Sequence, residues 1–224
     1  MAVPSNAAAP TPMPDTRADP VLVAAWLAAR STARGLPQPV PDFGGLRVDT
    51  NAPTETRRFV FARACDGLAA LGRIIDDPLT PLKLCASAEV MAELIGPLWA
   101  LDDSAAMMAC ETAMSARAVP HGYRILIDER EGVLQSSVHA LSGARAASGY
   151  AVEQGGIFAF DRIIVEPGHQ RRGLGSAMMA ALAGRRRDAA SRYVLVATAA
   201  GRALYEQLGW HIVTPYTTAT LASR

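Results

Sequence analysis

The stretch from Asp161 to Leu182, DRIIVEPGHQRRGLGSAMMAAL, constrains the fold of this 224-residue chain most strongly. It begins with a β-branched run, Ile163-Ile164-Val165, which is typical of a strand buried on both faces. Pro167-Gly168 ends that strand, and Gly173-Leu174-Gly175-Ser176 opens a helix with one apolar face. A strand, a glycine-bearing loop and a helix N-terminus in this order predict an anion site, because free N–H groups and the helix dipole favour negative charge there.

Spacing distinguishes the phosphate-binding motifs that share this arrangement. A P-loop needs a lysine and a hydroxyl residue after its second glycine, but Leu174 and Gly175 stand at those positions. A dinucleotide-binding fingerprint needs a small residue where Met178 stands. The pattern that remains is Gln/Arg-x-x-Gly-x-Gly, filled by residues 170–175. Taken alone, it is compatible with a phosphate-binding loop or with a tight turn.

A second motif follows this loop after one helix and one strand. Residues 193–198, YVLVAT, form an apolar strand candidate, and residues 203–210, ALYEQLGW, predict a short helix ended by glycine. The two motifs in this order resemble the GNAT superfamily of acyl-CoA-dependent N-acyltransferases, in which a Leu-Tyr-x-x-x-Gly-Phe/Trp segment follows the pyrophosphate-binding loop. The resemblance covers about residues 119–221.

The resemblance implies an α/β (α+β) fold with a mixed, mostly antiparallel sheet, a splayed central strand and flanking helices. The residue pattern agrees with it, since apolar runs separated by turn residues predict an antiparallel meander that leads into the central strand. These runs lie at residues 123–128, 133–141, 144–152 and 157–165, and two terminal strands are expected at 211–216 and 217–221.

The preceding part of the chain predicts a smaller N-terminal α/β lobe at residues 55–116, followed by a GNAT-like domain at 117–224. The lobe either supplies the strand and helices that the superfamily places before the meander, or forms a separate domain. Its expected elements are strands at 58–62, 82–85 and 105–110, and helices at 67–75 and 88–101, the latter capped by Ser87 and ended by Asp102-Asp103.

Residues 1–54 are rich in alanine, proline and glycine. They predict a disordered tail over residues 1–20 and a Pro/Gly-rich arm over residues 35–54. Residues 21–30 predict one short helix between them, too short to span a bilayer.

Composition narrows the range of partners and compartments. The net charge is +1 and half of the residues are hydrophobic, which gives no reason to expect nucleic acid or an anionic membrane as a partner. Three cysteines without metal-ligand spacing, in a chain without a secretory signal, predict free thiols in a reducing cytoplasm and no metal site.

The resemblance implies acetyl-CoA as the acyl donor and assigns parts of its site. The pyrophosphate would lie against backbone N–H groups of the loop, with the charges of two arginines beside it, and the pantetheine arm would follow the exposed backbone of the central strand. At the end of the next strand many relatives carry an asparagine where this chain has Thr198. The implied cofactor-binding residues are Ile163, Ile164, Val165, Gln170, Arg171, Arg172, Gly173, Leu174, Gly175, Ser176 and Thr198.

Two residues are candidates for proton transfer. Tyr205 matches the superfamily's tyrosine near the cofactor sulfur, so it is either the acid that protonates the leaving thiolate or a packed aromatic residue. Asp161 precedes Ile163 by two positions, which predicts the same face of the strand. It either accepts the proton of the amine or pairs with Arg162 or Arg124. His121 and His139 are weaker candidates for the base.

The implied function is an acetyl-CoA-dependent N-acetyltransferase that acts on an amine of a small molecule or protein by direct attack. The alternative from another class is a non-catalytic acyl-CoA-binding or regulatory module. The resemblance is also compatible with a homodimer.

Overall fold

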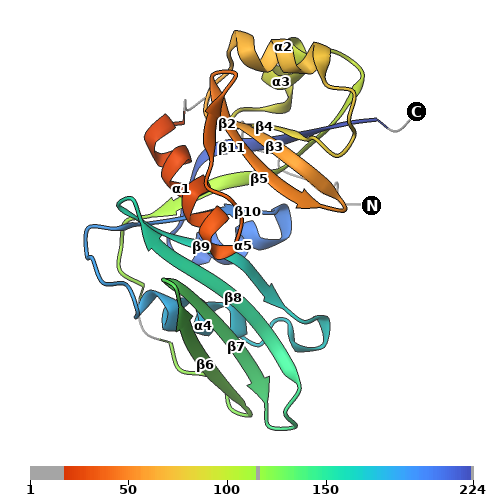
Figure 1. Ribbon diagram of the computed structural model, residues 1–224. Helices are drawn as coiled ribbons and strands as arrows, with labels where there is room; N and C mark the ends of the chain where they lie inside the picture. The colour runs from red at the N-terminus through yellow and green to blue at the C-terminus, as the bar shows by residue number, and fades with distance from the viewer. Residues whose placement is uncertain (1–17, 115–116, 223–224) are drawn as a thin grey trace, which may run out of the picture.

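The computed structural model describes residues 18–114 and 117–222, and in this part of the chain eleven strands form one sheet (Figure 1). The fold is mixed α/β, with a large, mostly antiparallel sheet and flanking helices, as predicted. The elements are α1 (Pro20–Ala33), β1 (Val40–Asp42), β2 (Gly45–Ala52), β3 (Glu55–Phe61), α2 (Asp66–Ile74), β4 (Leu82–Leu84), α3 (Ala88–Ile95), β5 (Trp99–Cys110), β6 (Tyr123–Arg130), β7 (Val133–Ala140), β8 (Arg145–Gln154), β9 (Ile157–Val165), the 3₁₀ turn η1 (Pro167–His169), α4 (Leu174–Ala183), β10 (Arg192–Ala197), α5 (Ala199–Gln207) and β11 (His211–Leu221).

The strand order across the sheet is β1-β2-β3-β4-β11-β5-β10-β9-β8-β7-β6. The predicted meander is confirmed, because β6, β7, β8 and β9 pair with one another in antiparallel succession. β5 lies between β11 and β10 and pairs with both, so strands from the predicted N-terminal lobe and from the predicted GNAT-like domain share hydrogen bonds. The division of the chain at residue 116 stays a prediction.

Three predicted boundaries are wrong. The helix expected at 88–101 ends at Ile95, because Gly96 adopts a left-handed φ of 79° and Pro97 follows it. Asp102 and Asp103 therefore lie inside β5. The two expected terminal strands are one strand, β11, whose irregularities at Ile212/Thr214 and Tyr216/Thr218 do not interrupt it.

The N-terminal region contributes ordered structure that the sequence only partly predicted. The short helix at 21–30 is present as the longer α1, and β1 and β2 lie within the predicted arm. A disordered tail was predicted over residues 1–20, of which residues 1–17 lie outside the described residues. For residues 18–20 the prediction is wrong, because Ala18 is buried in the α1-side core, Asp19 caps α1 and Pro20 is its first residue. α1 begins after Asp19, whose carboxylate accepts a hydrogen bond from the N–H of Val21 at 2.9 Å, and proline occupies the first helical position.

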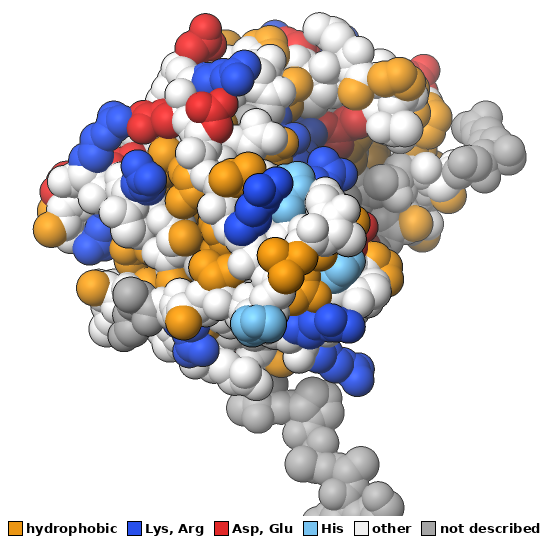
Figure 2. Space-filling model, turned by 90° about the horizontal axis from the view of Figure 1, so that it is seen from below, with side chains coloured by type: hydrophobic (Ala, Val, Ile, Leu, Met, Phe, Trp, Pro, Cys, Tyr) orange, Lys and Arg blue, Asp and Glu red, His pale blue; other side chains and the backbone are white. Residues whose placement is uncertain are grey.

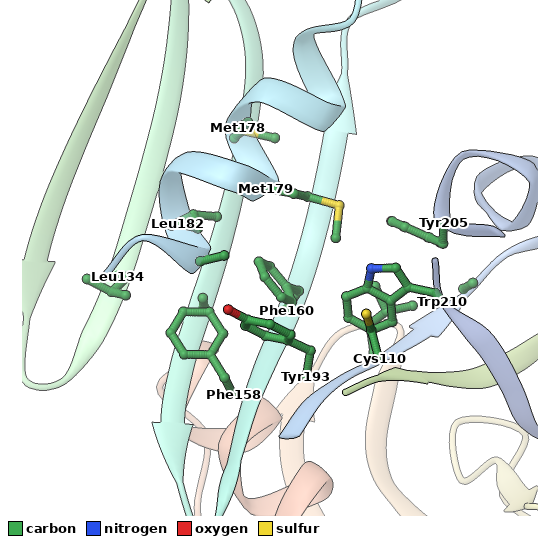
Figure 3. Packing of buried hydrophobic residues seen from close by; sticks show 14 of the residues in the cluster. Cys110, Leu134, Phe158, Phe160, Met178, Met179, Leu182, Tyr193, Tyr205 and Trp210 are labelled. Atoms are coloured by element: carbon green, nitrogen blue, oxygen red, sulfur yellow. The ribbon is translucent and has the colours of Figure 1, made fainter. Parts of the chain in front are cut away.

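Two hydrophobic cores cover opposite faces of the sheet. The α4-side core contains Phe158, Phe160, Tyr193 and Trp210, and Figure 3 shows Met178, Met179 and Leu182 of α4 facing these aromatic rings. The α1-side core contains Trp26, Leu27, Ala159, Val194 and Tyr216. In Figure 1, α1 accordingly lies in front of the sheet and α4 behind it.

A third cluster lies under α2 and α3 at the top of Figure 1, built around Phe61, Leu68, Leu84 and Met91. The alternation along each strand produces this layering, since neighbouring side chains point to opposite faces. In β9, for example, Phe158 and Phe160 pack against α4, whereas Ala159 between them packs on the α1 side.

Candidate active site

The parallel strands β9 and β10 separate part-way along their length. The two strands pair over three residues each, with Ile157, Phe158 and Ala159 of β9 opposite Arg192, Tyr193 and Val194 of β10. Beyond Ala159, β9 continues to pair with β8 on its other side, up to Val165. Within the described residues, the edge of residues 161–165 that faces β10 therefore has no strand partner. The predicted splay of this strand is present in the structure.

A bulge in β9 accompanies the separation. The register shifts between Ser148 and Tyr150 of β8, and Arg162 adopts a left-handed φ of 51°. Gly149 lies opposite this bulge, where a Cβ atom would come within 2.6 Å of the Cδ1 atom of Ile163. Bulges bend a strand and re-aim its side chains, so a residue without a side chain opposite the bulge gives β9 the room to bend.

The same bulge overturns the prediction that Asp161 and Ile163 share a face. Asp161 bonds to α1 on one side of the sheet, whereas Ile163 packs with the α4-side core on the other. The alternation rule fails here because the bulge inserts one extra residue between the two positions.

A cavity of about 280 Å³ lies where β9 and β10 diverge. It is lined from both faces of the sheet, with Phe160, Leu195 and Tyr205 belonging to the α4-side core and Trp26 and Tyr216 to the α1-side core. The remaining lining residues are Arg30, Arg34, Lys83, Asp161, Arg162, Ile163, Ile164, Val196 and Thr198. A molecule lying along the open edge of β9 would thus reach a space that is accessible to both faces.

Asp161 is bound by arginines rather than left free. Arg34 donates from Nε and Nη2 to the two carboxylate oxygens, each at 2.8 Å, and Arg162 donates from Nε at 3.1 Å. Nε of Arg30 lies 3.9 Å from the same carboxylate. The alternative pairing with Arg162 is thus present, whereas Arg124 is not among the partners recorded for Asp161. Both carboxylate oxygens accept hydrogen bonds from arginines, so the Asp161 carboxylate orients the side chains of Arg34 and Arg162 beside the cavity.

Tyr205 is 7% exposed and belongs to the α4-side core, where its ring lies 5.9 Å from that of Trp210 (Figure 3). Burial raises the pKa of its hydroxyl to about 12, so this hydroxyl keeps its proton throughout the neutral range. Tyr205 therefore has a packed ring, as expected of a structural aromatic residue, and it also lines the cavity, as expected of an acid that protonates the leaving thiolate.

The loop before α4 has the geometry of an anion site. Gly173 is the N-cap of α4 with a left-handed φ of 77°, and Arg171 also has a positive φ of 59°. Nε2 of Gln170 donates to the carbonyl of Val165 at 3.3 Å, which ties the loop to the end of β9. Leu174 and Ser176 are buried under the helix start, as is Gly175, whose added Cβ would meet Leu204 at 3.1 Å.

Basic side chains surround this loop. Arg172 donates to the hydroxyl of Tyr123 at 3.0 Å, and that hydroxyl lies 3.0 Å from Nδ1 of His169. Figure 2 shows arginine and histidine side chains beside hydrophobic ones on the face seen from below. The loop thus joins free helix N–H groups with nearby positive charge, as phosphate binding requires.

Thr198 forms a hydrogen bond within its own helix cap, whereas the asparagine found at this position in relatives is expected to contact the pantetheine arm. The Thr198 hydroxyl accepts a hydrogen bond from the N–H of Gly201 at 3.4 Å, which caps α5. The residue still lines the cavity, so its side chain contributes polar surface there while holding the start of α5.

Residues 124–212 match the family model of the acetyltransferase (GNAT) domain. This part of the chain is a GNAT domain. No curated protein matches the chain by sequence.

Solved structures with low sequence identity share the fold of the GNAT domain and of the residues before it. A GCN5-related N-acetyltransferase from Kribbella flavida is 11% identical, with a TM-score of 0.63 over 92% of this chain and 97% of that one. A GNAT-family protein from Novosphingobium aromaticivorans is 15% identical, with a TM-score of 0.53 over 92% of this chain and all of that one. A GCN5-related N-acetyltransferase-like protein from Streptococcus suis is 10% identical, with a TM-score of 0.53 over 80% and 84% of the two chains.

Several residues that line the cavity lie outside the GNAT domain's motifs and were not predicted from the sequence. α1 supplies Trp26 and Arg30, and its C-cap residue is Arg34. The three residues are spaced four positions apart, which places them on one side of the helix. This spacing could have predicted that the three side chains lie together. Lys83 could also have been singled out from the sequence, because it is the only lysine of the chain. Tyr216 gave no signal, since nothing in its strand sequence distinguishes it from a core tyrosine.

Among the described residues, no group of three or more His, Cys, Asp or Glu side chains is placed to hold a metal ion. None of the helices in residues 18–114 and 117–222 is both long enough and apolar enough to cross a membrane. The three cysteines are free thiols.

Lys83 gives the GNAT domain's cavity a pH-dependent charge. Burial lowers the pKa of its ammonium to about 8, with Glu55 acting in the opposite direction. The unfolded-state pKa is about 10.4. Below pH 8 the group is charged in both states and its burial cost is fully present. Between about pH 8 and 10.4 the unfolded chain holds more protons, so the stability of the protein rises with pH.

We therefore expect Lys83→Met to stabilise the protein at pH 7. The variant removes a buried charge but also a hydrogen bond to Thr218, so the net gain should be on the order of 2 kcal/mol. Urea unfolding at pH 7 and at pH 9.5 measures it, and the gain should shrink at the higher pH. An equal gain at both pH values would contradict the assigned pKa.

Proposed function

We propose that this protein transfers an acetyl group from acetyl-CoA to an amine by direct attack of the amine on the thioester. One observation carries the proposal. The unpaired edge of β9 begins at the loop before α4 and ends at the cavity that Tyr205 lines. An elongated donor with a pyrophosphate at one end and a thioester at the other matches this sequence of features.

The loop of residues 170–176 would hold the pyrophosphate of the donor. Backbone N–H groups at the start of α4 face outward there, and the left-handed backbone at Gly173 leaves space that a side chain would fill. Arg171 and Arg172 would add positive charge. The backbone of Ile163, Ile164 and Val165 would bond to the pantetheine arm through the groups that no strand partner uses.

The donated group is proposed to be short. A cavity of about 280 Å³ has to contain both the acyl group and the reacting end of the acceptor, so acetyl fits better than a long acyl chain. The free thiols and acetyl-CoA as donor both favour the cytoplasm as the compartment.

The proposed transfer needs no reactants other than acetyl-CoA, the amine, water and side chains of this protein. The amine nitrogen attacks the carbonyl carbon, a C–N bond forms and the C–S bond breaks, and the sulfur leaves as a thiolate. Tyr205 would give its proton to the thiolate and regain one from solvent. A fixed N–H donor at the β9 edge would stabilise the oxyanion, a contribution of about 2.7–4 kcal/mol in enzymes generally.

The group that accepts the proton of the amine is proposed to be other than Asp161. Because both oxygens of that carboxylate accept hydrogen bonds from arginines, we propose that water takes the proton. The cationic side chains that line the cavity would lower the pKa of an acceptor ammonium and raise the fraction of free amine. Asp161 would hold Arg34 and Arg162 in place.

The loop assignment predicts that Gly173→Glu weakens CoA binding by at least roughly a hundredfold, since a like charge facing the pyrophosphate costs several kcal/mol. Calorimetric titration with CoA measures the change. Gly132→Glu is a matched control, because Gly132 has the same φ of 77° and lies in the β6–β7 turn. Wild-type affinity in Gly173→Glu would refute the assignment.

The acid assignment predicts that Tyr205→Phe retains CoA affinity and loses turnover by roughly ten- to a thousand-fold. With the hydroxyl pKa at about 12, the loss should be nearly constant between about pH 6 and 9. Steady-state rates on protein of verified fold measure it. Wild-type turnover with reduced stability would instead assign Tyr205 to packing alone. Tight CoA binding without acetyl transfer to any amine would favour a non-catalytic acyl-CoA-binding module.

A further inference from the structure

The cavity between β9 and β10 is lined by an excess of positive charge. Four cationic side chains face it, namely Arg30, Arg34, Lys83 and Arg162, whereas Asp161 is the one acidic side chain among its lining residues. Partly buried charges that lack partners are costly, and they are retained where a ligand completes them or where neighbours pair them.

Two of these cations are already paired. Arg34 forms a two-point bond with Asp161, and Arg162 bonds to the same carboxylate and to the carbonyl of Ala33. The guanidinium of Arg162 also lies 3.9 Å from the ring centroid of Tyr150. These contacts use the one carboxylate of the cavity, so Asp161 does not neutralise the other two cations.

Arg30 and Lys83 have no carboxylate at hydrogen-bond distance within the described residues. Arg30 lies 3.9 Å from the nearest oxygen of Asp161 and 5.7 Å from the ring centroid of Trp26. The ammonium of Lys83 donates to the hydroxyl of Thr218 at 3.2 Å, and a hydroxyl leaves its charge uncompensated.

Nearby acidic residues are committed elsewhere. Glu55 acts on the charges of Arg30 and Lys83, but it accepts hydrogen bonds from Arg58, and burial raises its pKa. Asp102 accepts a hydrogen bond from the N–H of Ser104 at 2.9 Å. Neither residue lines the cavity. The two cations therefore face the cavity with donors to spare.

We propose that the acceptor is a primary amine that also carries an oxyanion group, a carboxylate or a phosphate, held by Arg30 and Lys83. This inference rests on the proposed function. The oxyanion would lie on the α1 side of the sheet and the amine would point through the gap toward the thioester. Charge-assisted hydrogen bonds to such a group are about twice as strong as neutral ones. The same field opposes polycationic acceptors such as polyamines.

Matched acceptor pairs test this class directly, with acetyl-CoA as the donor and the full chain as the enzyme. The carboxylate pairs are phenylalanine with phenethylamine and leucine with isoamylamine. The phosphate pair is O-phosphoethanolamine with ethanolamine, and spermidine represents polycations. In at least one pair we expect the oxyanion-bearing member to have a kcat/KM more than about tenfold higher, and the type of that pair distinguishes carboxylate from phosphate. Equal values within every pair, or a preference for spermidine, would overturn the proposal.

Variants of Arg30 separate recognition from general loss. Arg30→Gln should abolish the preference within the favoured pair while leaving CoA affinity unchanged, and Arg30→Lys should restore part of it. Arg73→Gln is the control, since Arg73 is exposed on α2. A preference that survives Arg30→Gln would contradict the assigned residue.

If no amine is acetylated, a binding measurement tests whether the cavity recognises an oxyanion-bearing amine. Titration of O-phosphoethanolamine, phenylalanine and the matching amines into the CoA complex reports recognition without turnover. Binding of an oxyanion-bearing member that Arg30→Gln removes would support the acceptor site while the proposed transfer fails. Equal affinities within every pair, or no binding by any of them, would overturn the inference, whatever the fate of the proposed transfer.

Discussion

The separation of β9 from β10 is the feature on which the rest of the site depends. Pairing ends after Ala159, and the bulge at Arg162 bends β9 away while it stays bonded to β8. At the point of divergence, Arg34 at the C-cap of α1 forms a two-point ion pair with Asp161 of β9. α1 is thereby both a cover for the sheet and a wall of the cavity.

This arrangement links the N-terminal region to the chemistry of the GNAT domain. α1 contributes Arg30, β4 contributes Lys83, and β11 contributes Tyr216 to one cavity. The features that we propose to bind the donor come from residues 161–176. Three of the four cationic side chains that line the cavity, Arg30, Arg34 and Lys83, lie outside residues 124–212. We infer that the GNAT domain supplies transfer and that the preceding residues select the acceptor.

The sequence predicted the meander and the loop because each leaves a local signal in turn residues or glycine spacing, whereas the splayed strand was implied only by the resemblance to the GNAT superfamily. It did not predict the position of Asp161, since one residue in a left-handed conformation at Arg162 reverses the face of every later side chain. Nor did it predict the cationic side chains that line the cavity, because burial of Lys83 and Arg30 depends on strands that are far apart in the chain. That Lys83 is the only lysine could be read from the sequence, but its position in the cavity could be seen only in the structure.

We propose that the open edge of β9 binds the arm of an acyl-CoA donor. Amide hydrogen exchange of residues 161–165, measured by NMR with and without saturating CoA, tests this proposal. We expect amides on this edge to exchange more slowly in the complex, while amides of residues 145–149, on a strand paired on both sides, should change little. Saturating CoA binding with unchanged exchange at residues 161–165 would contradict it.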